Sequence, residues 1–157
     1  MKEIQKGENA PGLITMAAKQ GYDKPENLTK VYHMGFIPEA ERQALVYSAA
    51  DAFLCTTLAD GQPQTALESL ACGTPVIAFD LGPMPEIVVT GKTGYLAGTP
   101  SASNLKRTIG NFLQNTEHRS AFQNDCRDFA VMKYDLRKQT QKYIDLYERI
   151  LGSRHFY

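Results

Sequence analysis

The sequence predicts an α/β protein with a parallel sheet buried between helices. Residues 51–56 (DAFLCT) and 75–79 (PVIAF) are continuous, mostly apolar runs of strand length. Strands that are apolar without alternation are typical of parallel sheets covered on both faces. A Gly/Pro loop at residues 80–85 follows the second run, at the end of a strand where open α/β sheets place ligands. The sequence therefore predicts alternating strands and helices around a ligand site.

Further elements of this pattern follow along the chain. Residues 31–36 (VYHMGF) carry β-branched and aromatic side chains and have Gly35 near their end, which fits a strand that leads into a turn at a site. A helix is expected next, because Pro38 suits a first helical turn and acidic residues follow it. Residues 94–97 form the last expected strand. Residues 13–19 (LITMAAK) fit either a strand or a helical turn.

The chain becomes helical in character after Pro100. Ser103 can cap a helix that runs to about residue 114, and residues 117–132 and 136–151 have the apolar spacing of two further helices. The last of these gathers apolar and aromatic side chains on one side: Tyr143, Leu146, Tyr147 and Ile150.

The composition indicates one soluble globular domain. We divide its 157 residues into a poorly defined lead-in (1–30), an α/β core (31–100) and C-terminal helices (101–157). Seventeen basic and seventeen acidic residues give a net charge of zero, so the positive charge of a typical nucleic-acid-binding domain is absent. No nucleic-acid partner is therefore expected.

The cysteines and histidines do not suggest a metal site. The three cysteines lack metal-ligand spacing, and the three histidines are scattered singly, which favours structural or surface roles. No signal peptide is visible, and no apolar run approaches the roughly 18 to 20 residues of a membrane helix. We expect reduced thiols and a cytoplasmic protein.

Residues 59–75 (ADGQPQTALESLACGTP) combine a turn, a short helix and a helix stop. Gly61 allows positive φ and Pro63 fixes its own φ, so the segment is expected to begin with a turn. Good helix formers occupy residues 64–71, and Gly73 begins the stop. A helix N-terminus is therefore predicted to face the loop.

The start of this helix is predicted to attract an anion. Free N–H groups at a helix N-terminus bind phosphates, and two carboxylates, Asp60 and Glu68, lie around this one. A diphosphate on the helix end, with one carboxylate on a sugar and the other on a ribose diol, fits a nucleotide-sugar. A surface turn followed by an amphipathic helix with a solvated Glu68 is the alternative that the loop leaves open.

The flanking motifs bear on that choice. Asp60 and Glu68 are separated by seven residues, and the pair is followed by a Gly-Thr-Pro stop at residues 73–75. Together with the runs YSAAD (47–51), PEIV (85–88) and GKTG (91–94), these residues resemble the C-terminal, nucleotide-sugar-binding domain of GT-B retaining glycosyltransferases, the group 1 family. The first acid of this family is usually Glu, one methylene longer than Asp60.

The resemblance implies a fold and an activity. The fold would be the Rossmann-like C-terminal half of GT-B, a parallel sheet flanked by helices, with a helical C-terminal segment. The enzyme would transfer a sugar from a UDP- or GDP-linked donor to an acceptor such as a growing glycan or a lipid, with retention of configuration. Neither a cofactor nor a metal is implied. The complete enzyme would be cytoplasmic, with peripheral binding to the inner membrane face as a further option.

The resemblance also assigns roles to single residues. Glu68 would accept hydrogen bonds from the ribose hydroxyls, and Asp60 would be the catalytic-site acid that orients the donor sugar. The remaining binding residues fall into three groups. They are the backbone of Gly61 and Gln62 for the sugar, the N–H groups of Thr65 and Ala66 for the diphosphate, and Gly35, Phe36 and Ile37 beside the base.

Two parts of the family pattern are not visible. No Gly-Arg and Lys-containing segment, which would supply the basic pair for the diphosphate, precedes residue 31, and no acceptor-binding domain is present. The chain is thus expected to be a partial donor-binding domain whose partner is an N-terminal GT-B domain. An apolar surface is expected where the missing portions would pack. Either residues 13–19 and the last helices cover this surface, or the protein self-associates.

The sequence also bears on two other classes of function. A non-catalytic nucleotide-sugar-binding or scaffold domain, derived from a glycosyltransferase, is the alternative because of Asp60 and the missing basic pair. A dinucleotide-dependent oxidoreductase is disfavoured, since the sequence contains no G-x-G-x-x-G.

Overall fold

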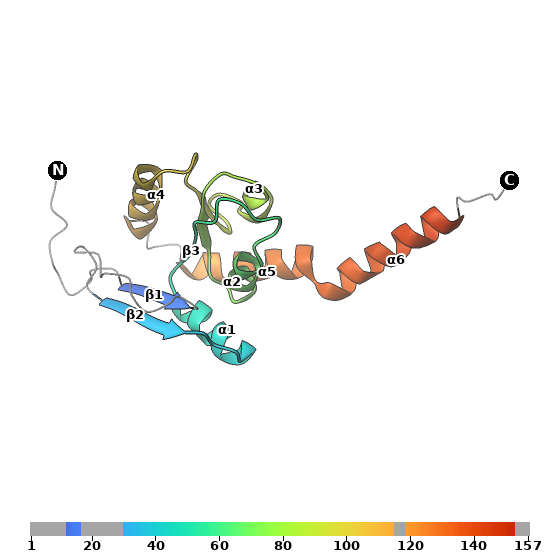
Figure 1. The fold of residues 1–157 in the computed structure, drawn as a ribbon, viewed down its shortest axis with the longest axis horizontal. Helices are drawn as coiled ribbons and strands as arrows, with labels where there is room; N and C mark the ends of the chain where they lie inside the picture. Colours follow the sequence, from blue (N-terminus) through green and yellow to red (C-terminus); the bar gives the residue numbers. More distant parts are fainter. Residues whose placement is uncertain (1–11, 17–29, 115–118, 153–157) are drawn as a thin grey trace. The chain divides into compact units, whose positions relative to one another are not determined.

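The computed structural model describes residues 12–16, 30–114 and 119–152 (Figure 1). Its fold divides the chain after Val46 into two compact units. The boundary falls inside the helix α1 (Ala40–Ala49). Strand pairing follows the same division, because the described strands form two separate sheets.

The first unit contains a two-stranded parallel sheet. Its strands are β1 (Gly12–Met16) and β2 (Lys30–Gly35), with Leu13 opposite Val31 in the register. The expected strand at β2 is confirmed and begins one residue earlier. The ambiguous sequence at β1 is a strand because β2 supplies a hydrogen-bonding partner.

The second unit contains a three-stranded parallel sheet. Its strands are β3 (Phe53–Cys55), β4 (Val76–Ala78) and β5 (Gly94–Leu96), with β4 in the centre. Both pairings are parallel, so the predicted fold class is confirmed. The fourth expected strand, β2, pairs with β1 instead. Apolar runs indicate strands but do not identify their neighbours.

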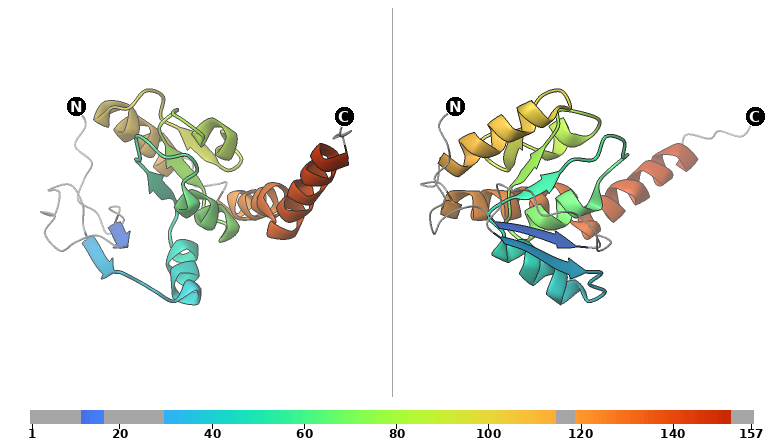
Figure 2. Two further views of the ribbon diagram at one scale, coloured as in Figure 1. Left: turned by 45° about the vertical axis from the view of Figure 1, so that its right-hand side comes forward. Right: turned by 60° about the vertical axis from the view of Figure 1, so that its left-hand side comes forward.

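Strand β4 is buried on both faces. Val76, Ile77 and Ala78 are each at most 1% exposed. Val76 and Ala78 belong to a core cluster that includes Leu70 of α2 (Gln64–Ala71). Ile77 belongs to a second cluster on the opposite face. That face is covered by α4 (Ala102–Gln114), and Figure 2 shows α2 and α4 on opposite sides of the sheet.

The helix α5 (Arg119–Tyr134) contributes to both clusters. Its Cys126 is fully buried with the β4 residues of the first cluster, and its Phe122 packs with Phe112 and Tyr95 in the second. The rings of these three aromatic residues lie 5.9 to 6.2 Å apart in tilted or edge-on geometry. Such aromatic pairs stabilise a core beyond their buried area.

The start of α4 differs from the sequence-based expectation. Ser101 caps it, because the Asn104 N–H donates to Ser101 Oγ at 3.1 Å. Ser103 lies within the first turn of the helix and bonds Ser101 through its hydroxyl. The cap falls two residues earlier than expected because the helix already begins at Ala102.

The two remaining helices are α3 (Met84–Ile87) and α6 (Leu136–Gly152). No residue of α6 is buried, and the four apolar or aromatic side chains expected on one side of it are all exposed. The rings of two of them, Tyr143 and Tyr147, lie 6.4 Å apart. Among the described helices, none has the length and apolar character needed to cross a bilayer.

Gly94 is required where β5 meets β4. Its φ is +148°, and a Cβ built on it would lie 1.8 Å from the Val76 carbonyl oxygen. We expect Gly94→Ala to lower the free energy of unfolding by roughly 3 kcal/mol or more, since backbone strain and overpacking add. Urea denaturation followed by circular dichroism measures this loss.

Gly91→Ala is the matched control for this substitution. Gly91 also has a positive φ, +81°, but a Cβ there would meet no heavy atom within 4 Å. Gly91→Ala should therefore lower the free energy of unfolding only by the cost of a positive φ at a non-glycine residue, about 1 kcal/mol. Equal losses at the two positions would contradict the predicted clash with β4.

Candidate functional site

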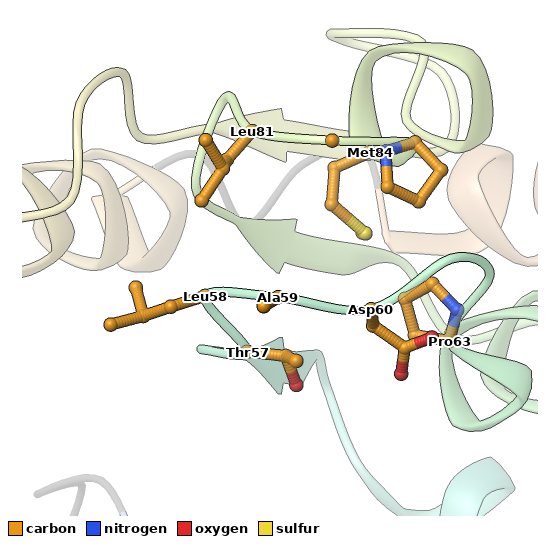
Figure 3. Close-up of a pocket in the computed structure, with 9 residues that line it drawn as sticks. Thr57, Leu58, Ala59, Asp60, Pro63, Leu81 and Met84 are labelled. Atoms are coloured by element: carbon orange, nitrogen blue, oxygen red, sulfur yellow. The ribbon is translucent and has the colours of Figure 1, made fainter.

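A cavity of about 170 Å³ lies at the carboxyl ends of β3 and β4. Two loops line it, one following each strand (Figure 3). The lining residues are Thr57, Leu58, Ala59, Asp60 and Pro63 from the first loop, Leu81, Gly82 and Pro83 from the second, and Met84 at the start of α3. This is the edge of a parallel sheet where α/β proteins bind ligands.

The two loops approach each other closely. A Cβ at Gly82, whose φ is +55°, would lie 3.7 Å from the Asp60 carbonyl oxygen. Figure 3 shows the Met84 side chain pointing toward the loop that carries Asp60. Met84 is buried in the core cluster, so it anchors one wall of the cavity to the interior.

Asp60 is exposed and is held by its own loop. Its Oδ1 accepts a hydrogen bond from the Gln62 N–H at 2.9 Å. This bond closes the predicted turn. The sequence suggested a positive φ at Gly61, but Gly61 is not among the glycines with positive φ. The carboxylate is therefore oriented by a backbone donor, while its second oxygen carries no protein bond among the described residues.

The N-terminus of α2 begins directly after this loop. Pro63 precedes its first turn, and within the described chain no side chain caps this end. Gln64 and Thr65 are the first two helical residues, whose N–H groups have no acceptor inside a helix. Ala66 is different, since its N–H donates to the Pro63 carbonyl at 3.1 Å. Of the two N–H groups assigned to a diphosphate, only that of Thr65 is at a position without an intrahelical acceptor.

Glu68 lies in the next turn of α2 and is exposed. Its Oε2 accepts a hydrogen bond from the Tyr47 hydroxyl at 3.1 Å. Tyr47 is only 4% exposed. Burial, and then the neighbouring Glu68 carboxylate, raise the pKa of Tyr47 well above its ordinary value, so the phenol remains a donor. The sequence places Tyr47 only in a flanking motif and gives no sign of this bond.

Buried hydrogen bonds hold Tyr47 against the end of α2. Its carbonyl accepts from Thr74 Oγ1 at 2.7 Å, and the Thr74 carbonyl in turn accepts from Ser69 Oγ at 2.9 Å. The Tyr47 ring also packs edge-on against Phe53 of β3, with centroids 5.6 Å apart. Tyr47, Glu68, Ser69 and Thr74 thus form one polar junction, which fixes α2 relative to β3.

The residues expected beside a nucleotide base belong to the first unit. Gly35 ends β2 with φ +65°, and Phe36 after it is 77% exposed. The Ile37 carbonyl accepts a hydrogen bond from the Gln43 side-chain amide. Asp60 and Glu68 belong to the second unit, so the two groups of expected site residues are in different units.

The cysteines and His33 do not form a second chemical site within the described residues. Cys55, Cys72 and Cys126 are free, and burial raises the pKa of the Cys126 thiol to about 12. His33 Nδ1 bonds Thr15 Oγ1 at 2.8 Å across the first sheet. In the part of the chain that the structure describes, no group of three or more His, Cys, Asp or Glu is placed to hold a metal ion.

Known proteins share this sequence pattern and fold. The family model of the glycosyl transferases group 1 matches residues 18–129. A D-inositol 3-phosphate glycosyltransferase of Mycobacteroides abscessus is 29% identical over 123 residues, which cover 70% of this chain and 28% of that protein. An uncharacterized glycosyltransferase of Methanocaldococcus jannaschii is 21% identical, with coverage of 78% and 31%.

Solved structures give the same result for the fold. Sucrose-phosphate synthase from Thermosynechococcus elongatus matches with a TM-score of 0.70 and 25% identity, over 79% of this chain and 31% of the synthase. Anabaena HepE in complex with UDP matches with a TM-score of 0.67 and 21% identity, over 76% of this chain and 32% of HepE. The chain spans about a third of the length of these relatives.

The buried Thr74 hydroxyl is expected to stabilise the polar junction. Thr74→Val keeps the shape of the side chain but removes the donor to the Tyr47 carbonyl. We expect it to lower the free energy of unfolding by about 1 to 2 kcal/mol, measured by urea denaturation. Thr56→Val, at an exposed threonine next to β3, is the control and should change stability by less than about 0.5 kcal/mol. Similar losses in both variants would contradict this role.

Proposed function

This chain belongs to the group 1 family of glycosyltransferases, and on that premise we propose that it is the donor-binding part of a sugar-transferring enzyme. The donor would be a UDP- or GDP-linked sugar, and the acceptor a glycan or a lipid. Transfer would retain the configuration of the sugar. The observation that supports this most directly is the cavity bordered by Asp60, beside an uncapped helix N-terminus that carries Glu68 one turn later.

The start of α2 suits the diphosphate of such a donor. The N–H groups of Gln64 and Thr65 have no intrahelical acceptor, and no side chain of the described residues caps this end. A phosphate there would accept hydrogen bonds from these groups and would lie at the positive end of the helix dipole. Relatives of the same fold support this assignment, since Anabaena HepE binds UDP and UDP-glucose.

The cavity suits the donor sugar. Its walls combine the apolar side chains of Leu58, Leu81 and Met84 with the carboxylate of Asp60. Asp60 would accept hydrogen bonds from sugar hydroxyls through the oxygen that Gln62 does not use. Its negative charge would also favour the positive charge that develops on the sugar as the bond to the diphosphate breaks. We assign neither a metal nor a cofactor to this step.

Glu68 suits the ribose of the nucleotide. A carboxylate on the exposed side of α2 can accept hydrogen bonds from two neighbouring hydroxyls, and charged acceptors of this kind bind more strongly than neutral ones. The acceptor substrate would bind to an N-terminal GT-B domain, which we propose as the partner of this unit. The role of Gly35, Phe36 and Ile37 at the base stays a prediction from the resemblance.

A non-catalytic nucleotide-sugar-binding domain is the second candidate. One observation favours it: Asp60 is one methylene shorter than the usual Glu, and its Oδ1 already accepts the Gln62 N–H at 2.9 Å. Mixing this chain with an N-terminal domain and measuring hydrolysis of the bound donor distinguishes the two. Donor binding without turnover in that mixture would support the second candidate.

Nucleotide affinity should increase with the number of phosphates. We expect uridine to bind more weakly than UMP, and UMP more weakly than UDP, with Kd for UDP of about 0.1 to 1 mM by titration calorimetry. Added salt should weaken the binding of UDP. The guanosine series is tested in parallel, because the sequence does not identify the base.

Substitutions at Gln64 test the role of the backbone donor. Gln64→Pro removes one N–H at the first position of α2, where proline is well tolerated, whereas Gln64→Ala keeps that N–H. The proline variant should bind UDP more weakly and uridine with unchanged affinity. The alanine variant should bind both with the affinity of the parent protein. Equal affinity of the parent protein for uridine and UDP would contradict a phosphate site at this helix end.

Glu68→Gln tests the ribose contact. We expect it to lower the affinity for UDP by roughly tenfold or more, because a charged acceptor is replaced by a neutral one. The amide oxygen can still accept from the Tyr47 hydroxyl, so the urea denaturation midpoint should be unchanged. Glu148→Gln, at an exposed glutamate of α6, is the matched control. Unchanged UDP affinity in Glu68→Gln would exclude the ribose assignment.

A further inference from the structure

We propose that Tyr47 is a positioning residue for Glu68. Its hydroxyl would hold the Glu68 carboxylate in the orientation that accepts the ribose diol, although Tyr47 itself would not touch the nucleotide. The inference rests on the proposed function, because it assumes that Glu68 binds ribose. It adds a buried residue from a different helix to the donor site.

The hydrogen bond itself is the first support. Tyr47 Oη donates to Glu68 Oε2 at 3.1 Å, and Glu68 is otherwise an exposed side chain on the surface of α2. An exposed glutamate samples several rotamers and loses this freedom when it binds a ligand. A bond to a fixed partner removes part of that loss before the ligand arrives.

The second support is that Tyr47 is a fixed partner. Its side chain is 4% exposed, and its ring packs edge-on against Phe53. Its carbonyl accepts from Thr74 Oγ1 at 2.7 Å and from the Ala50 N–H at 3.0 Å. A residue held at both its backbone and its ring cannot follow the movements of an exposed glutamate. The phenol therefore determines where the carboxylate lies.

The third support is the number of acceptor positions that remain. A carboxylate offers about four lone-pair positions, and the phenol occupies one of them on Oε2. Oε1 keeps both of its positions, and Oε2 keeps one. The two hydroxyls of a ribose diol can therefore both be accepted while the bond from Tyr47 is present.

Tyr47→Phe is the test, because it removes the hydroxyl and keeps the ring that packs on Phe53. We expect Kd for UDP to rise about 3- to 10-fold, and Kd for 2′,3′-dideoxy-UDP, which lacks the diol, to stay unchanged. Tyr134→Phe is the matched control, since that half-buried ring also packs edge-on against a phenylalanine, Phe129, at 6.0 Å. It should change neither Kd. GDP and its dideoxy form are used in the same way if the parent protein binds GDP.

The double variant Tyr47→Phe/Glu68→Gln completes a cycle with the two single variants. If Tyr47 acts through Glu68, its removal should have a smaller effect once Glu68 is replaced. If Tyr47 had only a structural role, Tyr47→Phe would instead lower the affinities for UDP and 2′,3′-dideoxy-UDP by the same factor. This factor would be the same in the parent protein and in Glu68→Gln. That result, or unchanged UDP affinity in Tyr47→Phe, would overturn the positioning role.

Failure of the proposed function would look different from failure of this inference. If Glu68→Gln lowers the affinity for UDP but Tyr47→Phe does not, the ribose assignment stands and the positioning role is wrong. If Glu68→Gln leaves UDP affinity unchanged, the ribose assignment is wrong and the positioning role falls with it. A parent protein that binds neither UDP nor GDP overturns both.

Discussion

The second unit depends on the complete burial of β4. A three-residue strand with exposures of 1% or less needs apolar cover on both faces, and α2 and α4 supply it from opposite sides. With β4 bonded to a parallel neighbour on each side, the loops after β3 and β4 emerge at the same edge. The cavity and the start of α2 are therefore consequences of how the core is covered.

The polar junction connects this core to the site. Thr74 and Ser69 are almost fully buried, and their hydroxyls satisfy carbonyl groups that would otherwise be costly to bury. The same junction contains Tyr47, whose hydroxyl reaches the exposed carboxylate of Glu68. The hydrogen bonds of the buried residues Ser69, Thr74 and Tyr47 thus continue to Glu68, the side chain that we propose to bind substrate.

The sequence predicted the elements better than it predicted their partners. Apolar runs identified β3 and β4, and the Gly-Pro turn identified the start of α2, because these signals are local. The pairing of β2 with β1 depends on distant residues, so no local pattern reveals it. The bond from Tyr47 to Glu68 joins residues 21 positions apart on two helices. The hydrogen bond from the Ala66 N–H to the Pro63 carbonyl depends on the geometry of the first turn, which composition does not specify.

The short sequence separations within the polar junction have a consequence for folding during synthesis. Its bonds join residues 5, 21 and 27 positions apart, so closing them fixes only short loops and costs little chain entropy. All of its members precede α4, α5 and α6 along the chain. A ribosome therefore synthesises all members of the junction before the helices that complete the hydrophobic clusters. We expect these short loops to close early when the unit folds, which would leave α4 and α5 a preformed surface to cover.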